Sequence, residues 1–221
     1  DIGFVTSHGK VHRIHAADVP SFGDAFDASQ SVTAQEFLGL PKDERILTLI
    51  ELNEKAELAL GTEQGVVKRV VADYPAKDEF EVITLKDGDK VVGASLATDT
   101  STLVFVSSDA QLLHYSAASV RPQGRPAGGV AGINLDEAAK VIYFGAVENA
   151  ASAVVVTAAN SSLSIPGTDA GSLKISDLSE FPGKGRATGG VRSQRFVRGE
   201  DQLYFAWAGS EPIWALTADG K

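Results

Sequence analysis

Two glycine-rich basic segments constrain this chain more than any other feature. The first basic loop runs from Arg121 to Val130 and the second from Pro182 to Arg192, and their Gly-Arg and Gly-Gly-Val elements match at an offset of 61 residues. The second continues through Arg195 to Arg198, with five basic residues and no acid. Glycine permits backbone geometry that other residues resist, so both segments are predicted to form tight, exposed cationic loops. A loop that occurs twice at one offset indicates an internal repeat.

A pattern of four short strands recurs along the chain. Each unit is expected to contain a strand, a tight turn, a second strand, a polar loop, a third strand, an acidic turn and a fourth strand. The tight turns fall near Gly9, Gly65, Ala110 and Gly171, at successive offsets of 56, 45 and 61 residues. The third strands are expected within Phe80–Leu85, Ile133–Leu135 and Arg195–Val197, and short helical turns within 36–40 and 136–139.

Repetition of a four-stranded unit every fifty or so residues is typical of a β-propeller. We therefore predict an all-β chain, a propeller-like array with about four blades, forming a single domain over residues 1–221. The approximate repeats are 1–52, 53–100, 101–150 and 151–210, and residues 211–221 are expected to begin another round. A sandwich of hairpins is the competing fold, although packing alone would not make loops recur.

The composition narrows the function classes. A net charge of -9 argues against a uniformly basic nucleic-acid binder, but acidic residues crowd the first quarter and the basic loop lies in the last. The chain has no cysteine, no apolar run of membrane-spanning length and no signal peptide, so a cytoplasmic protein without a membrane is expected. It begins at Asp1 and holds no methionine, and we expect it to be part of a longer protein.

Several segments are similar to the C-terminal domain of the A subunit of bacterial type IIA DNA topoisomerases, DNA gyrase and topoisomerase IV. Residues 65–69 with 73–75 resemble the blade hairpin of this family, 85–94 its returning strands, and 120–125 with 129–135 its inter-blade loop, which 181–192 repeats. The likeness covers essentially the whole chain, and the sequence is most similar to the topoisomerase IV-like A subunits of actinobacteria.

The resemblance implies a β-pinwheel, a propeller variant in which adjacent blades exchange strands. It also implies a non-catalytic domain that binds and wraps duplex DNA within an ATP-dependent bacterial enzyme associated with the nucleoid. The catalytic tyrosine, the ATP and the Mg²⁺ would belong to other parts of that enzyme, so no cofactor is expected here. The implied partners are duplex DNA, the remainder of the A subunit and the ATPase B subunit.

Basic residues of the repeated loops are the candidate DNA contacts, because lysine and arginine release condensed counterions when they neutralise phosphates. The set contains Lys184, Arg186, Arg192 and Arg195, then Arg121 and Arg125, and finally Arg13, Lys68 and Arg69 from equivalent hairpin positions. The plainer interpretation of any one of them is a solvated surface charge. A metal site at His8, His12 and His15 is not expected, since His12 and His15 face opposite sides of a strand.

In gyrase, a Gln-rich Arg-Gly-Gly-Lys-Gly box fixes a tight positive wrap of DNA. The most similar segment of this chain is 183–186, which lacks the full box. Together with the acidic balance, this favours decatenation or relaxation over strong negative supercoiling. The alternative function is an acidic β-propeller module that docks a protein and has little DNA binding of its own.

Overall fold

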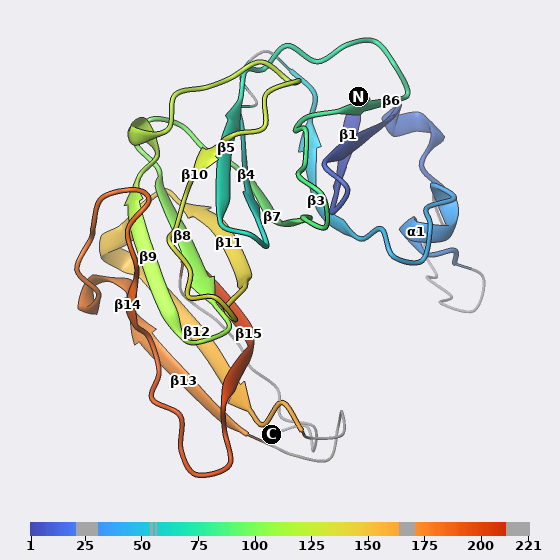
Figure 1. Cartoon of the computed structure of the whole chain (residues 1–221). Helices are drawn as coiled ribbons and strands as arrows, with labels where there is room; N and C mark the ends of the chain where they lie inside the picture. Colours follow the sequence, from blue (N-terminus) through green and yellow to red (C-terminus); the bar gives the residue numbers. More distant parts are fainter. Residues whose placement is uncertain (21–30, 54, 56, 164–170, 211–221) are drawn as a thin grey trace.

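The computed structural model describes residues 1–20, 31–53, 55, 57–163 and 171–210. Short antiparallel strands dominate this part of the chain (Figure 1). They are β1 (Ile2–Thr6), β2 (Lys10–Ile14), β3 (Ile46–Glu51), β4 (Leu58–Thr62), β5 (Val66–Val70), β6 (Glu79–Glu81), β7 (Val91–Leu96), β8 (Thr102–Ser107), β9 (Gln111–Ser116), β10 (Val130–Ala131), β11 (Val141–Val147), β12 (Ala153–Asn160), β13 (Ser172–Asp177), β14 (Val191–Arg192) and β15 (Gln202–Ser210).

The helical elements are single turns. Helix α1 (Ala34–Phe37) carries a capping box, in which Thr33 and Glu36 satisfy each other's backbone N–H groups. The 3₁₀ turns are η1 (Ala16–Asp18), η3 (Ala117–Ser119), η4 (Ala150–Ser152) and η5 (Leu178–Glu180). The helical turn expected at 36–40 thus begins two residues earlier, whereas the one expected at 136–139 is not formed.

The strands form four sheets, or blades, in the described part of the chain. Their orders are β3-β1-β2-β6, β10-β5-β4-β7, β11-β8-β9-β14 and β13-β12-β15. In each of the first three blades the outermost strand comes from the following repeat: β6 pairs with β2, β10 with β5, and β14 with β9. This exchange confirms the all-β pinwheel prediction and rules out the hairpin sandwich. The expected further round at 211–221 lies outside the described residues.

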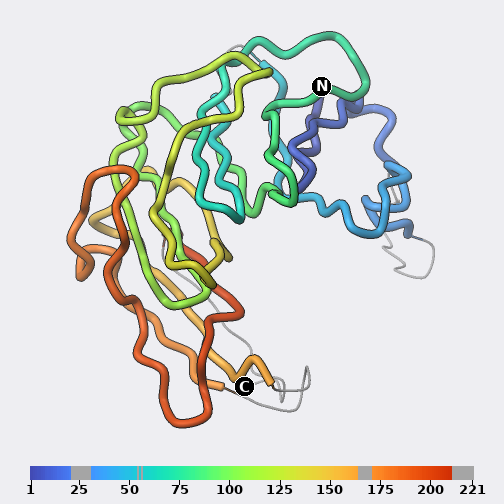
Figure 2. Tube along the Cα trace, viewed as in Figure 1, coloured from blue at the N-terminus to red at the C-terminus, as the bar shows by residue number. Residues whose placement is uncertain are grey.

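Three strands of each blade lie within one of the predicted repeats, and the blades follow one another along an arc (Figure 2). The tight turns of the first three hairpins have left-handed residues at Gly9, Gly65 and Ala110. A register shift recurs at the end of the first strand of every blade, between Val5 and Thr6 in the first. The blades are therefore copies of one backbone design.

The hydrophobic core is divided among the spaces between blades. Phe80 and Leu60 belong to the cluster between the first and second blades, Phe105 and Phe144 to the second cluster, and Leu112 and Val155 to the third. Phe105 is fully buried, and its ring centroid lies 4.8 Å from that of Phe144. Because both faces of an inner blade are covered, even its polar strand residues are drawn into the interior.

The exchanged strands differ from the expected ones. Phe80 does lie in an exchanged strand, but β6 ends at Glu81 instead of continuing to Leu85. Strands expected at 133–135 and 195–197 are absent, and the chain pairs earlier, through the Val130 and Val191 that close the two Gly-Gly-Val elements. Gly129, with φ of 80°, makes the turn into β10, where a Cβ would meet the Val67 carbonyl oxygen at 2.6 Å. The glycines of the two Gly-Gly-Val elements thus allow the exchanged strands to approach the receiving blade closely.

Candidate nucleic-acid interface

The second basic loop rests on the residues that follow the first. The Ala187 amide donates to the Gly132 carbonyl oxygen (2.8 Å), and the Asn134 amide donates to the Thr188 carbonyl oxygen (3.0 Å). The Arg186 guanidinium donates to the carbonyl oxygen of Ala131 (2.5 Å). These contacts fix the second loop against the strand into which the first loop leads.

The first basic loop rests in the same way on the residues after β6. The Thr84 amide donates to the Ala127 carbonyl oxygen (3.4 Å), which repeats the bond between Asn134 and Thr188. The Thr84 hydroxyl donates to the Pro126 carbonyl oxygen (2.8 Å). The two basic loops, residues 121–130 and 182–192, are therefore packed in the same way at successive positions along the row of blades.

Internal contacts shape the second loop itself. The Lys184 ammonium donates to the carbonyl oxygen of Gly190 (3.2 Å), and the Thr188 hydroxyl donates to that of Gly185 (2.7 Å). Ala187 adopts a left-handed conformation, with φ of 61°, between them. These contacts are weakly shielded from water, because Lys184 and Gly185 are exposed. The loop is a defined turn, and its cations remain available to a ligand.

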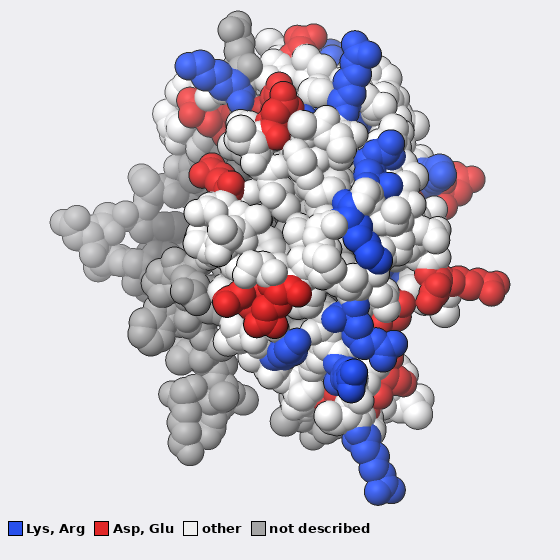
Figure 3. Space-filling view, turned by 90° about the vertical axis from the view of Figure 1, so that its left-hand side faces the viewer, with Lys and Arg blue, Asp and Glu red and all other residues white. Residues whose placement is uncertain are grey.

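Six of the nine predicted contact residues lie in the two basic loops or just after the second one. Arg121, Lys184, Arg192 and Arg195 are exposed, and Arg125 and Arg186 are half-buried. Within the described part of the chain, none of the six forms an ion pair with an acid. Figure 3 shows Lys and Arg side chains gathered in a column down one side of the face that carries these loops. Acidic side chains also flank this column (Figure 3), so its positive charge is locally bordered by negative charge.

Arg192 and Arg195 extend the basic surface toward the fourth blade. Both line an open groove of about 1040 Å³ beside β13, which Leu173 and Ser193 also line. Lys174 also lines the groove and donates to the Ser193 carbonyl oxygen (2.9 Å). Arg192 and Arg195 are both exposed where they line this groove.

The expectation that Lys68 and Arg69 are surface charges is wrong. Both are fully buried, at 0% and 1% of their accessible area. The Lys68 ammonium donates to the carbonyl oxygens of Val82, Arg125 and Ala127 (2.7–2.8 Å), and so secures the first basic loop from beneath. Burial, with a smaller contribution from the nearby Arg125 charge, lowers the pKa of Lys68 to about 8.

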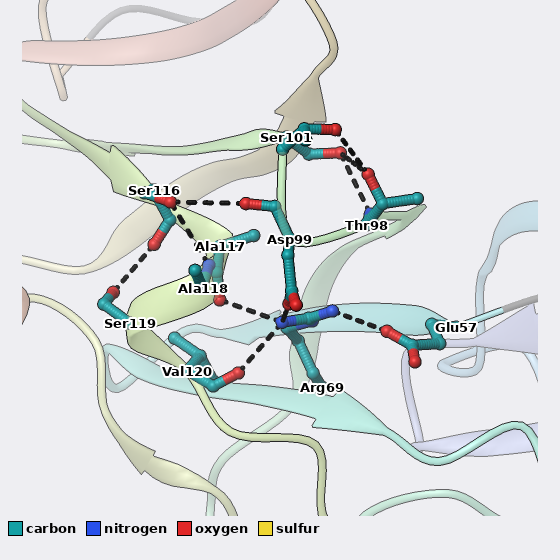
Figure 4. Close-up of polar contacts among 11 residues, drawn as sticks. Glu57, Arg69, Thr98, Asp99, Ser101, Ser116, Ala117, Ala118, Ser119 and Val120 are labelled. Carbon is teal, nitrogen blue, oxygen red and sulfur yellow. Dashed lines mark hydrogen bonds and ion pairs between the residues drawn. The ribbon is translucent and has the colours of Figure 1, made fainter.

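Arg69 and Arg13 are also engaged in internal contacts. The Arg69 guanidinium forms ion pairs with Glu57 and Asp99 and donates to two backbone carbonyl oxygens (Figure 4). Arg13 is partly exposed, forms an ion pair with Asp1 and donates to the Pro75 carbonyl oxygen (2.8 Å). Burial removes Arg69 from the candidate interface, whereas a DNA contact of the partly exposed Arg13 stays a prediction.

Sequence reasoning missed His114, which lies beneath the second basic loop. Its Nε2 is 2.8 Å from the Phe181 carbonyl oxygen, and its own carbonyl oxygen accepts from the Lys184 amide (3.2 Å). The available signal was its place in β9, which matches that of Arg69 in β5 once the hairpins are aligned on Ala110 and Gly65.

The described residues contain no group of three or more His, Asp or Glu side chains placed to hold a metal ion. His8 and His12 both lie within 3.6 Å of the buried Glu44 carboxylate, and His15 caps η1. No helix within the described ranges is long and apolar enough to cross a membrane.

This arrangement of strand-exchanged blades joined by basic loops defines a β-pinwheel domain, and comparisons with known proteins agree. The family model described as "DNA gyrase C-terminal domain, beta-propeller" matches residues 81–98, 101–148 and 167–203. The A subunit of DNA gyrase from Mycobacterium leprae is 26% identical over 98% of the chain, and that from Streptomyces coelicolor is 27% identical over 98%. The chain spans 17% and 25% of these two relatives.

Solved structures share the fold. The C-terminal domain of DNA topoisomerase IV has a TM-score of 0.79 at 19% identity, covering 94% of this chain and 62% of that one. The DNA gyrase A C-terminal domain has a TM-score of 0.69 at 21% identity, covering 95% and 66%. The chain is similar to the A subunit of DNA gyrase over nearly its whole length and shares the fold of these C-terminal domains, which confirms the resemblance inferred from its sequence.

Proposed function

We propose that this chain binds and wraps duplex DNA along the two basic loops, as part of a type II DNA topoisomerase. The observation that supports the proposal best is the seating of the second basic loop on the end of the first. This seating brings together two loops whose cations form no ion pair with an acid among the described residues. Phosphate neutralisation by such cations supplies most of the affinity of sequence-independent DNA binding.

The parent enzyme would cleave and reseal DNA elsewhere, and its ATP and Mg²⁺ would be held outside this domain. We propose that the remaining A subunit and an ATPase B subunit are its partners, and that it acts on the bacterial chromosome in the cytoplasm. A net charge of -9 and the incomplete basic box at 183–186 favour a modest wrap, suited to decatenation or relaxation.

The test is charge reversal. Replacing Lys184, Arg186, Arg192 and Arg195 together by Glu should abolish duplex binding in a low-salt gel-shift titration. In the parent chain, each of these phosphate contacts should contribute about 0.9 to the slope of log K against log salt. The matched control reverses the exposed Lys42, Lys55, Lys86 and Lys140, which changes the net charge equally but lies outside both loops.

If the control variant loses binding as completely as the loop variant, only the overall charge matters and the interface is wrong. If the parent chain itself has no duplex affinity below roughly millimolar at low salt, the protein-docking alternative is favoured, because ordinary non-specific binding lies near 10⁻⁴–10⁻⁶ M.

A further inference from the structure

One strand position makes the same kind of contact in three blades. The position lies in the second strand of each hairpin, four residues after the left-handed turn residue Gly9, Gly65 or Ala110. It is occupied by Arg13 opposite Gly3, Arg69 opposite Ala59 and His114 opposite Val104. In the fourth blade the equivalent residue is Ile175, opposite Val156, which has no polar side chain.

Each of the three polar residues meets a loop that arrives from the next blade. The side chain of Arg13 reaches the carbonyl oxygen of Pro75, between β5 and β6. Arg69 reaches the carbonyl oxygens of Ala117 (3.1 Å) and Val120 (3.3 Å), which lie between β9 and β10. His114 reaches that of Phe181, between β13 and β14. The contact therefore accompanies strand exchange in every blade where exchange is seen.

Arg69 is held firmly enough to fix its loop. Its side chain is 2% exposed, and Figure 4 shows its guanidinium between Glu57 on one side and Asp99, Ala117 and Val120 on the other. The Asp99 carboxylate lies 2.6 Å away. Val120 immediately precedes Arg121, the first cation of the first basic loop, so the direction in which that loop leaves the blade is set at its root.

His114 makes the corresponding contact at the root of the second basic loop. Because a carbonyl oxygen only accepts, the Nε2 facing Phe181 must carry a hydrogen. The ring also lies against Gly183, where an added Cβ would be 3.3 Å from the His114 Cε1 atom. Together with the bond from the Lys184 amide to the His114 carbonyl oxygen, these contacts hold the chain on both sides of Gly183.

We propose that Arg69 and His114 are positioning residues for the DNA path. Each fixes a basic loop just before its cations, and so sets where the phosphates are received and how far the duplex bends between blades. The inference rests on the proposed DNA-binding function, but it assigns these two side chains no contact with DNA.

The test uses His114→Leu in the 221-residue chain, which removes the ring donor and leaves every cation in place. We expect amide hydrogen exchange over residues 182–190 to accelerate about tenfold or more. The salt slope of duplex binding should stay at the parent value, because the number of cations is unchanged. The linking-number change per bound domain, read by ligating nicked circular DNA, should fall by half or more. His114→Gln, whose amide supplies a donor, should recover part of both losses.

The readouts distinguish a failure of the anchor from a failure of DNA binding. If exchange and linking number both stay at parent values in His114→Leu, the inference is wrong. If exchange accelerates while the linking number is kept, the anchor holds the loop but does not set the DNA path, and the inference also fails. A fall in the salt slope would make His114 a contact residue and overturn it as well. If the parent chain binds no duplex, the proposed function fails, and the exchange data alone report on the anchor.

Discussion

The close approach of the second and third blades at Gly93 leads to a sharp stability prediction. Gly93 in β7 faces the backbone of Phe144 in β11, and a Cβ added there would lie 2.1 Å from the Phe144 carbonyl oxygen and 2.9 Å from its carbonyl carbon. Both are backbone atoms, so no change of side-chain rotamer can relieve the contact. Gly93→Ala must therefore push the two blades apart.

The cost follows from the distance. Ordinary van der Waals contacts of a Cβ begin at 3.4 Å, so the backbones must separate by more than 1 Å at this point. Overpacking a core by a methyl group typically costs about 1–3 kcal/mol. Because the opposing atoms are backbone, we expect the upper end, about 3 kcal/mol. For a chain of this size that lowers the melting temperature by about 6–12 °C.

The assay is urea denaturation followed by far-ultraviolet circular dichroism, with Gly185→Ala as the matched control. Gly185 has no atom within 4 Å of its would-be Cβ and no left-handed φ, so its replacement should be neutral or stabilise slightly through the unfolded chain. If Gly93→Ala lowers the free energy of unfolding by less than about 1 kcal/mol relative to Gly185→Ala, the close packing of these two blades is incorrect.

Two further substitutions test the interior. The pKa of Lys68 is lowered to about 8 by burial, so between pH 8 and its unfolded value of 10.5 the unfolded chain binds more protons and stability rises with pH. The stability of the parent relative to Lys68→Met should therefore increase by about 2 kcal/mol from pH 7.5 to 9.5 in urea titrations, and a constant difference would contradict this. Phe105→Ala should cost about 3–5 kcal/mol by the cavity it leaves, against little change for the exposed Leu163→Ala; equal melting temperatures would refute it.

The hairpins were predictable from the sequence because their signals are local. Alternation with period two and a turn residue at Gly9 or Gly65 specify two strands and the loop between them without reference to the rest of the fold. The exchanged strands were misplaced because β10 and β14 are only two residues long. Such strands have no periodicity to detect, and their pairing is decided by the blade that receives them.

The candidate site was predictable only where the cations lie on loops. Lys68 and Arg69 are adjacent strand residues that point to opposite faces, and in a sheet exposed on one side one of them would be solvated. Here both faces of the blade are covered by neighbours, so both charges are buried and bonded to backbone. The burial of Lys68 and Arg69 depends on the neighbouring blades, so it could not be predicted from the two residues themselves.

Strand exchange also has a consequence for synthesis on the ribosome. About 65, 60 and 75 residues separate β2 from β6, β5 from β10 and β9 from β14. At translation rates of about 5–20 residues per second, each hairpin waits several seconds for its outer strand, whereas the hairpin itself forms within microseconds. During that delay its open edge could pair with another nascent chain. The edges left waiting carry Lys10 and Arg13 in β2 and Lys68 and Arg69 in β5, and charged side chains on an open edge disfavour pairing with another strand.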